Sequence, residues 1–80
     1  MSKFSVINEV LEGFGFEFIK TINSVCHEFK KDELRIDIEE EKDEVVIYTV
    51  DGDNHQNLHS SADYDNLELE LSNEIKSLIE

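Results

Sequence analysis

Apolar side chains recur at spacings of three and four residues through the first part of the chain. The positions are Phe4, Ile7, Leu11, Phe14, Phe18, Ile22, Val25 and Phe29. Such spacing places the side chains on one face of a helix. Gly13 and Gly15 interrupt the pattern, because a glycine inside a helix costs about 1 kcal/mol relative to alanine. One helix bent at the glycines and two separate helices both fit, and the glycines favour two helices, 3–12 and 16–31, with Ser2 as the N-cap.

The middle of the chain changes to a period of two. Residues 33–41 alternate between apolar and charged side chains, which predicts a strand with one solvent-facing side. Residues 45–50 are rich in β-branched side chains and apolar on both faces, as in the middle of a sheet. Residues 56–60 are mostly polar and predict a weak third strand at a sheet edge. The segments between these strands, 42–44 and 51–54, are predicted turns.

The last segment returns to helical spacing, which predicts a helix over 63–79 with Ser60, Ser61 and Asp63 as capping candidates. Its apolar positions are Tyr64, Leu67, Leu71, Ile75, Leu78 and Ile79. The predicted order is α(α)βββα. This describes one α+β domain spanning residues 1–80, in which helices cover one face of a small three-stranded antiparallel meander.

Hydrophobic residues make up 39% of the 80-residue chain, including five Phe, which suffices for one core. We expect the core to contain one apolar residue from the apolar face of each predicted element. The residues predicted to be buried together are Ile22, Phe29, Ile36, Ile47 and Leu71.

The formal net charge of −13 is distributed unevenly. Residues 1–31 carry four acidic and four basic side chains, whereas residues 32–80 carry sixteen acidic and only three basic ones. Direct binding to nucleic acid or to an anionic membrane is therefore not expected, since phosphates would repel the second segment. Acidic residues interrupt the first twenty positions, which argues against a signal peptide or membrane helix, and the single cysteine suits a reducing compartment. These features favour a cytoplasmic protein.

No motif in the sequence predicts a catalytic, cofactor-binding or metal site. The segment that starts at Asp51 begins like an EF-hand loop but has Gln56 and Ala62 where that loop needs glycine and glutamate. His55 and His59 lie in a polar segment that does not suit a shared metal. Cys26 lies on the predicted apolar face and is interpreted as a small core residue rather than a nucleophile. We therefore expect a protein that is not an enzyme.

The acidic surface of the predicted first strand and last helix is the feature that stands out. A solvated surface that keeps the protein soluble would explain it, but such a surface usually interleaves more lysine. We therefore predict that a basic partner binds there. The predicted partner-binding residues are Asp37, Glu39, Glu41, Asp63, Asp65, Glu68, Glu70 and Glu74.

In size, acidity and α+β layout the chain resembles the small acidic inhibitors of phages and mobile elements, including DNA mimics and anti-CRISPR proteins. The resemblance rests on no motif, so no functional residue is carried over. It implies a non-enzymatic inhibitor that blocks a basic, nucleic-acid-binding protein surface. An immunity protein that neutralises a basic nuclease is the first alternative. A structural protein that self-associates through its N-terminal helices, for example as a homodimer, is the second.

Overall fold

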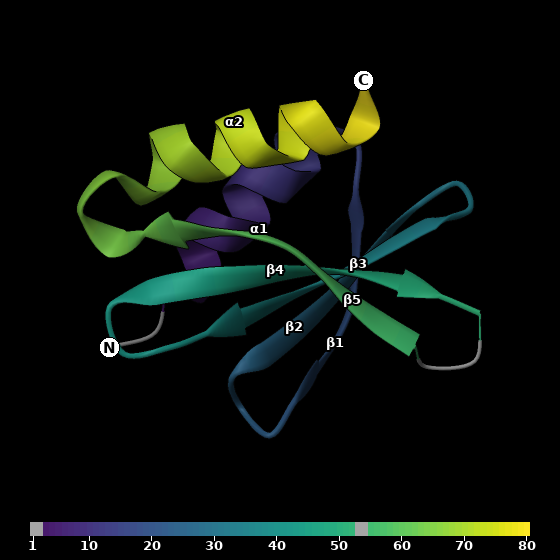
Figure 1. Cartoon of the computed structure of the whole chain (residues 1–80), viewed down its shortest axis with the longest axis horizontal. Helices are drawn as coiled ribbons and strands as arrows, with labels where there is room; N and C mark the ends of the chain where they lie inside the picture. The colour runs from purple at the N-terminus through teal and green to yellow at the C-terminus, as the bar shows by residue number, and fades with distance from the viewer. Residues whose placement is uncertain (1–2, 53–54) are drawn as a thin grey trace.

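The computed structural model describes residues 3–52 and 55–80, which form a helix, a five-stranded sheet and a second helix (Figure 1). The elements are α1 (Phe4–Gly13), β1 (Glu17–Ile22), β2 (Cys26–Lys31), β3 (Leu34–Glu40), β4 (Glu44–Asp51), β5 (His55–Asp63), the 3-10 helix η1 (Tyr64–Asn66) and α2 (Leu67–Ile79). The α+β class is confirmed, but the sheet has five strands instead of three. The predicted cap Ser2 and residues 53–54 of the predicted turn lie outside the described residues.

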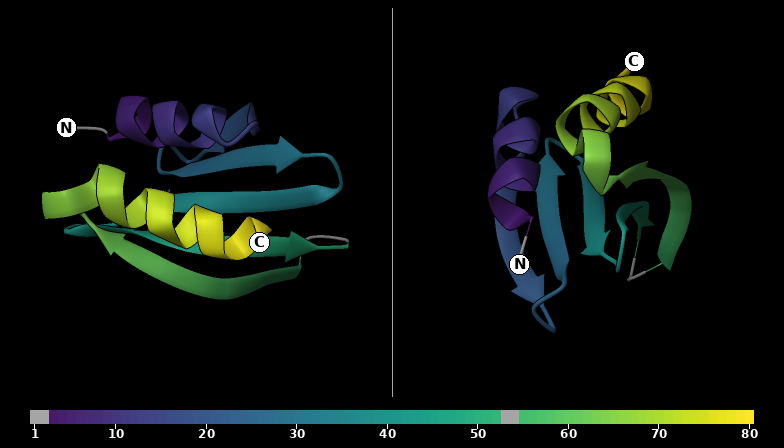
Figure 2. Two further views of the ribbon diagram at one scale, coloured as in Figure 1. Left: turned by 90° about the horizontal axis from the view of Figure 1, so that it is seen from above. Right: turned by 90° about the vertical axis from the view of Figure 1, so that its left-hand side faces the viewer.

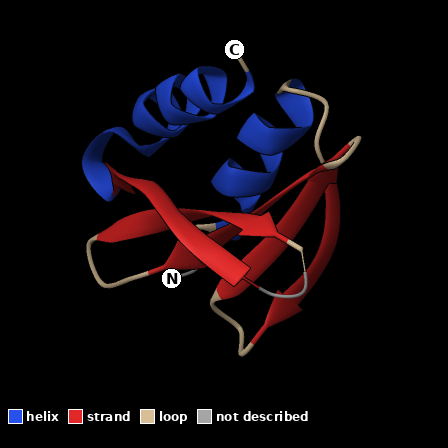
Figure 3. Ribbon diagram, turned by 45° about the vertical axis from the view of Figure 1, so that its right-hand side comes forward, coloured by secondary structure: helices blue, strands red, loops and turns tan. Residues whose placement is uncertain are grey.

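Both helices lie on the same face of the sheet, as the views in Figures 2 and 3 show. The strands follow one another as a meander, β1-β2-β3-β4-β5, and each neighbouring pair is antiparallel. The edge strands are therefore β1 and β5. The sheet is strongly twisted, and β5 bends across it (Figure 1).

The core lies between the sheet and the two helices. Phe29, Ile36, Ile38 and Ile47 point toward the helices and are fully buried. The helices complete the cluster with their own buried apolar residues: Ile7, Val10, Leu11, Leu67, Leu71 and Ile75. Four of the five predicted core residues are in this cluster, so the prediction is confirmed for Phe29, Ile36, Ile47 and Leu71.

The predicted second helix, 16–31, is wrong, because this segment forms the β1–β2 hairpin. Its apolar spacing fits a hairpin equally well. Phe18 and Phe29 pair across the two strands on the helix side, whereas Ile22 points to the other side and is 37% exposed. Ile22 was therefore wrongly predicted to be in the core.

Positive φ angles at Asn23 and Ser24 close the turn of this hairpin. Asparagine tolerates this conformation better than most residues, and two such central residues match the twist of a tight hairpin. Gly15 also has a positive φ, of 88°, in the connection from α1 to β1. The glycines therefore mark the end of a helix and the start of a strand, not a kink between two helices.

Two further boundaries differ from prediction. The third predicted strand, 56–60, is the longer strand β5, which forms a bulge where it pairs with Ile47 and Tyr48. The last helix begins at Leu67, after the 3-10 turn η1, rather than at residue 63. The bulge lets the strand bend, so that β5 brings Asp63 to the start of η1.

Within residues 3–52 and 55–80 no helix covers the opposite side of the sheet, which we call the open face. The strand registers place three rows of side chains on it. The rows are Ile22–Cys26–Glu39–Val46–Ser61, Lys20–Glu28–Asp37–Tyr48–Leu58 and Glu17–Lys30–Arg35–Val50–Gln56. Charged side chains of the central strands therefore lie on the open face, where only other side chains of the sheet cover them.

We expect Phe29→Ala to lower the free energy of unfolding by about 3–5 kcal/mol, because it removes a fully buried ring from the core. Leu69 is the control, since it is 64% exposed on α2 and truncation there should cost within about 0.5 kcal/mol. Urea unfolding of both variants tests this. An unchanged midpoint for Phe29→Ala would contradict the described core.

Candidate functional site

Two acidic side chains are buried on the open face, outside the apolar core. Glu28 and Asp37, which are register partners on the central strands β2 and β3, are only 7% and 2% exposed. Arg35 donates to Glu28, with 3.1 Å between Nη2 and Oε1. This ion pair compensates one of the two buried carboxylates.

A pocket of about 200 Å³ opens on this face, and all five strands contribute to it. It is lined by Ile22, Glu28, Arg35, Asp37, Val50 and Gln56. Ile22 belongs to one edge strand and Gln56 to the other, so the twist of the sheet brings both edges to one pocket. We call it the open-face pocket.

Asp37 is the most buried charged residue described, and only one of its carboxylate oxygens is satisfied. Oδ2 accepts a short hydrogen bond from the Gln56 amide. Oδ1 is buried and has no hydrogen-bond partner among the described residues. Burial raises the pKa of Asp37 and the Glu28 carboxylate raises it further, whereas the Gln56 hydrogen bond and Arg35 lower it.

Cys26 lies beside these carboxylates on the open face. Its predicted burial is confirmed, but its predicted place in the core is wrong, because it lies on the other side of the sheet from the cluster that packs against the helices. Burial, followed by the charges of Asp37, Glu39 and Glu28, raises its pKa to about 11. The thiol therefore stays protonated at neutral pH, and a protonated thiol is a weak nucleophile.

A second group of acidic residues gathers where the β3–β4 turn meets η1, on the left of Figure 1. The turn and η1 are held together by the Tyr64 amide, which donates to the Asp43 carbonyl at 3.1 Å, and by the Tyr64 hydroxyl, which donates to the Glu41 carbonyl at 2.6 Å. We call this group the acidic end. It consists of Glu39, Glu41, Asp43, Glu44, Asp63, Asp65, Glu68 and Glu70.

Like charges face one another at two places in the acidic end. Glu44 and Asp63 are direct register partners on β4 and β5, an arrangement that destabilises a sheet. Burial raises the pKa of Glu39, and both a hydrogen bond to the Glu41 carboxyl and repulsion from it raise this pKa further. The pKa of the Tyr64 hydroxyl is raised by burial and then by Glu40, Glu41 and Asp43.

Two acidic residues of this group have a local structural explanation. Glu68 and Glu70 lie in the first turn of α2, where the helix dipole favours negative charge. Glu70 also accepts a hydrogen bond from the Asp63 amide at 3.1 Å. The dipole of α2 does not explain the Glu39–Glu41 and Glu44–Asp63 pairs.

The structure brings six of the eight predicted partner-binding residues together, because Glu39, Glu41, Asp63, Asp65, Glu68 and Glu70 all belong to the acidic end. Asp37 does not belong with them, since its carboxylate is buried in the open-face pocket. Glu74 lies farther along α2. Sequence reasoning missed Asp43, Glu44 and Glu28, and the run of charges around the turn at 42–44 was the available signal for the first two.

Sequence reasoning also missed a partly buried network under α1. The neutral tautomer consistent with the contacts has His27 donating from Nε2 to Glu40 Oε2 at 2.6 Å and accepting at Nδ1 from the Thr21 hydroxyl at 2.8 Å. This is the group order of a hydroxyl, a base and a carboxylate. However, Glu40 Oε1 also accepts from the Lys3 amide at 2.7 Å, and the Phe4 ring lies 4.8 Å from the imidazole. The network thus ties the start of α1 to the sheet.

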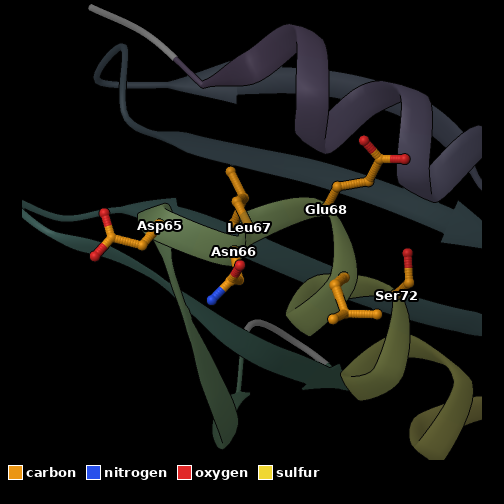
Figure 4. Close-up of a pocket in the computed structure, with 6 residues that line it drawn as sticks. Asp65, Asn66, Leu67, Glu68 and Ser72 are labelled. Carbon is orange, nitrogen blue, oxygen red and sulfur yellow. The ribbon is translucent and has the colours of Figure 1, made fainter.

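A larger depression, of about 470 Å³, lies at the start of α2 (Figure 4). Its lining residues are Asp65, Asn66, Leu67, Glu68, Leu69 and Ser72. They come from one continuous stretch of chain, and the Asn66 side chain does not cap the helix. The depression is therefore the surface of a single helix start and not a cleft between elements.

The described residues place no group of three or more histidine, cysteine, aspartate or glutamate side chains where they would hold a metal ion. Cys26 and His27 are consecutive in β2 and so point to opposite faces of the sheet. Neither α1 nor α2, the α-helices of the described chain, has the length and apolar character needed to cross a membrane.

Comparison with protein-family models, with curated proteins and with solved structures gives no significant match to this chain.

We expect Asp37→Asn to stabilise the fold at neutral pH, because it removes a buried charge and keeps a side chain that can bond to Gln56. A melting temperature several degrees above wild type is expected, since about 1 kcal/mol corresponds to about 4–8 °C in a domain of this size.

The pH dependence follows from the direction of the pKa shift. A carboxyl whose pKa is raised by folding destabilises the native state at high pH and stops doing so once it is protonated. The advantage of Asp37→Asn should therefore shrink as the pH falls toward the ordinary aspartate pKa of about 3.9. Thermal melts between pH 7 and pH 4 test this, and a destabilised variant at pH 7 would contradict the unsatisfied state of Asp37.

Proposed function

We propose that this protein is a non-enzymatic inhibitor that binds a basic, nucleic-acid-binding protein surface and blocks it. The observation that carries the proposal is the opposition of like charges at the acidic end, where Glu44 faces Asp63 and Glu39 faces Glu41. Natural proteins break such local rules mainly at functional sites. A row of lysine and arginine side chains on a partner would relieve this repulsion. Such a row normally pairs with the phosphates of nucleic acid, and the carboxylates of the acidic end would take the place of those phosphates.

A solubilising surface explains this arrangement less well. Solubility requires net charge, and dispersed carboxylates supply that charge without facing one another. In this protein the acidic residues instead converge from β3, β4, β5, η1 and α2 on one end of the molecule. The eight carboxylates outnumber the two nearby cations, Lys42 in the turn and Lys3 over the Tyr64 ring. A predominantly negative field of this kind steers a positively charged partner during association.

An immunity protein that neutralises a basic nuclease remains the alternative within the same binding chemistry, because it would use the same surface. The self-assembly proposal loses its original basis. The apolar stripe from Phe4 to Phe29 is not helical beyond Gly13, and the apolar face of α1 is buried against the sheet and α2.

Two charge-matched variants test the proposal. The first carries the amide substitutions Glu39→Gln, Glu41→Gln, Glu44→Gln and Asp63→Asn at the acidic end. The control carries Glu9→Gln, Glu17→Gln, Glu33→Gln and Asp51→Asn, all at exposed positions elsewhere. Each variant removes four of the negative charges from the total of −13, which leaves −9 in both.

The partner is first recovered by pull-down from host lysate and identified, and its affinity for each variant is then measured by calorimetry at low and high salt. We expect the acidic-end variant to bind about tenfold or more weakly at low salt, with a flatter salt dependence, and the control to bind as wild type does. The difference in affinity between the acidic-end variant and wild type should become smaller at high salt. The reason is that the electrostatic screening length falls from about 8 Å at physiological ionic strength to about 3 Å at 1 M.

A competition assay tests the mode of inhibition. Wild-type protein should displace nucleic acid from the recovered partner, and the acidic-end variant should displace it poorly. Equal loss of affinity in both variants would show that only total charge matters. A partner that does not bind nucleic acid, or one that binds protein and nucleic acid simultaneously, would contradict the proposal.

A further inference from the structure

The open-face pocket has the dimensions of a site for one side chain. Its volume is about 200 Å³, which is below the range of about 300–1,000 Å³ typical of pockets for drug-sized ligands. Ile22 and Val50 supply apolar walls, and Asp37, Glu28 and Gln56 supply polar atoms. Such a mixture suits a long side chain with an apolar stem and a polar head.

One of the residues that line this pocket carries an unsatisfied acceptor. Asp37 is 2% exposed, and its Oδ1 has no hydrogen-bond partner among the described residues. Buried polar atoms nearly always have a partner in native proteins. Oδ2 already accepts a hydrogen bond from Gln56, so the missing partner of this carboxylate is a hydrogen-bond donor for Oδ1.

The charges of the pocket favour a cation. Asp37 and Glu28 are both acidic, and Arg35 is the one cation among the lining residues and is already bonded to Glu28. The three lining groups therefore carry one net negative charge when Asp37 is ionised, while Lys20 of β1 is the register partner of Glu28. A monovalent cation that donates a hydrogen bond would satisfy both the charge and the acceptor.

A guanidinium suits this pocket better than an ammonium. It is more weakly hydrated, so it loses less on entering a partly apolar site, and its planar fork of donors can bond to a carboxylate while its faces pack against aliphatic walls. Arg35 already shows this behaviour on the same face, because its guanidinium bonds to the nearly buried Glu28 while 38% of its side chain stays exposed.

We propose that the open-face pocket receives the guanidinium of one arginine side chain from the basic partner, with the Asp37 carboxylate as its principal acceptor. This inference rests on the proposed function, because it names the group by which the partner is recognised. The acidic end then supplies long-range attraction, and the open-face pocket selects arginine over lysine. The entering cation also lowers the pKa of Asp37, which burial and Glu28 hold high in the free protein.

Hexa-arginine and hexa-lysine peptides serve as probes in titrations of isotope-labelled protein followed by amide NMR shifts. In wild type, hexa-arginine should bind more tightly than hexa-lysine and should shift the amides of Asp37, Val50 and Gln56. In Asp37→Asn the affinity for hexa-arginine should fall about fivefold or more, to near that of hexa-lysine. Asp63→Asn is the control, since it removes the same charge from the acidic end and should weaken both peptides to the same extent.

A second pair of variants guards against an effect of Asp37→Asn on folding. Gln56→Lys would place an ammonium of the chain's own beside Asp37 and should abolish the preference for arginine. Asn57→Lys adds the same charge at the next, exposed position of β5, where the register turns the side chain away from the open face. It should keep the preference.

The outcomes separate the two proposals. If both peptides bind and the arginine preference survives Asp37→Asn and Gln56→Lys, the pocket assignment is wrong and the acidic end alone accounts for binding. Equal binding of both peptides to wild type also overturns the pocket assignment. If neither peptide binds wild type at low salt, the proposed function itself fails.

Discussion

The packing of two helices against one side of the sheet is the interaction on which the rest of this structure depends. Ile36, Ile38 and Ile47 of the central strands are fully buried there, together with Phe29. A domain of 80 residues has material for one such core. Because the helices cover one face, the side chains on the open face can be buried only by one another, and these include charged residues as well as apolar ones.

Strand twist determines how well the open face can do this. A flat sheet would leave Glu28 and Asp37 in water, where their charges would cost little. The twisted sheet instead brings Ile22 and Gln56, from opposite edge strands, into one pocket with them. The result is a pair of carboxylates, one compensated by Arg35 and the other only half satisfied by Gln56. The apolar core therefore holds polar groups in a place that they would not occupy for their own stability.

The sequence predicts the elements that depend on local pattern. The helix near 3–12, the helix that ends at Ile79 and the strand near 33–41 have a clear period and are found in the structure. The strand near 45–50 is also found, and it was predicted from its β-branched composition. The segment 16–31 has a spacing that suits both a helix and a hairpin, and here pairing with β3 decides for the hairpin. Because the strands β1 and β2 are stabilised by distant partners, the period of their own residues does not distinguish the two structures.

The site shows the same division between local and tertiary information. Acidic residues next to one another in sequence, such as those from Glu39 to Glu44, identify half of the acidic end. The facing of Glu44 and Asp63 needs the register between β4 and β5, which the bulge in β5 alters. Asp37 was predicted as a solvent-facing residue by alternation alone. The alternating pattern predicts the correct face of the strand for Asp37, but it does not predict the sheet twist that buries the side chain.

The two faces of β3 explain how a small domain can carry this electrostatic cost. Ile36 and Ile38 lie in the core while Asp37 and Glu39, between and beside them, face the opposite side. The strand therefore cannot turn its carboxylates toward water without withdrawing two fully buried isoleucines from the core. The free energy of the core holds the acidic groups in position before any partner arrives, so a partner need not supply the cost of assembling them. Attraction to the proposed basic partner would then appear largely as binding free energy, because the repulsion has already been overcome in folding.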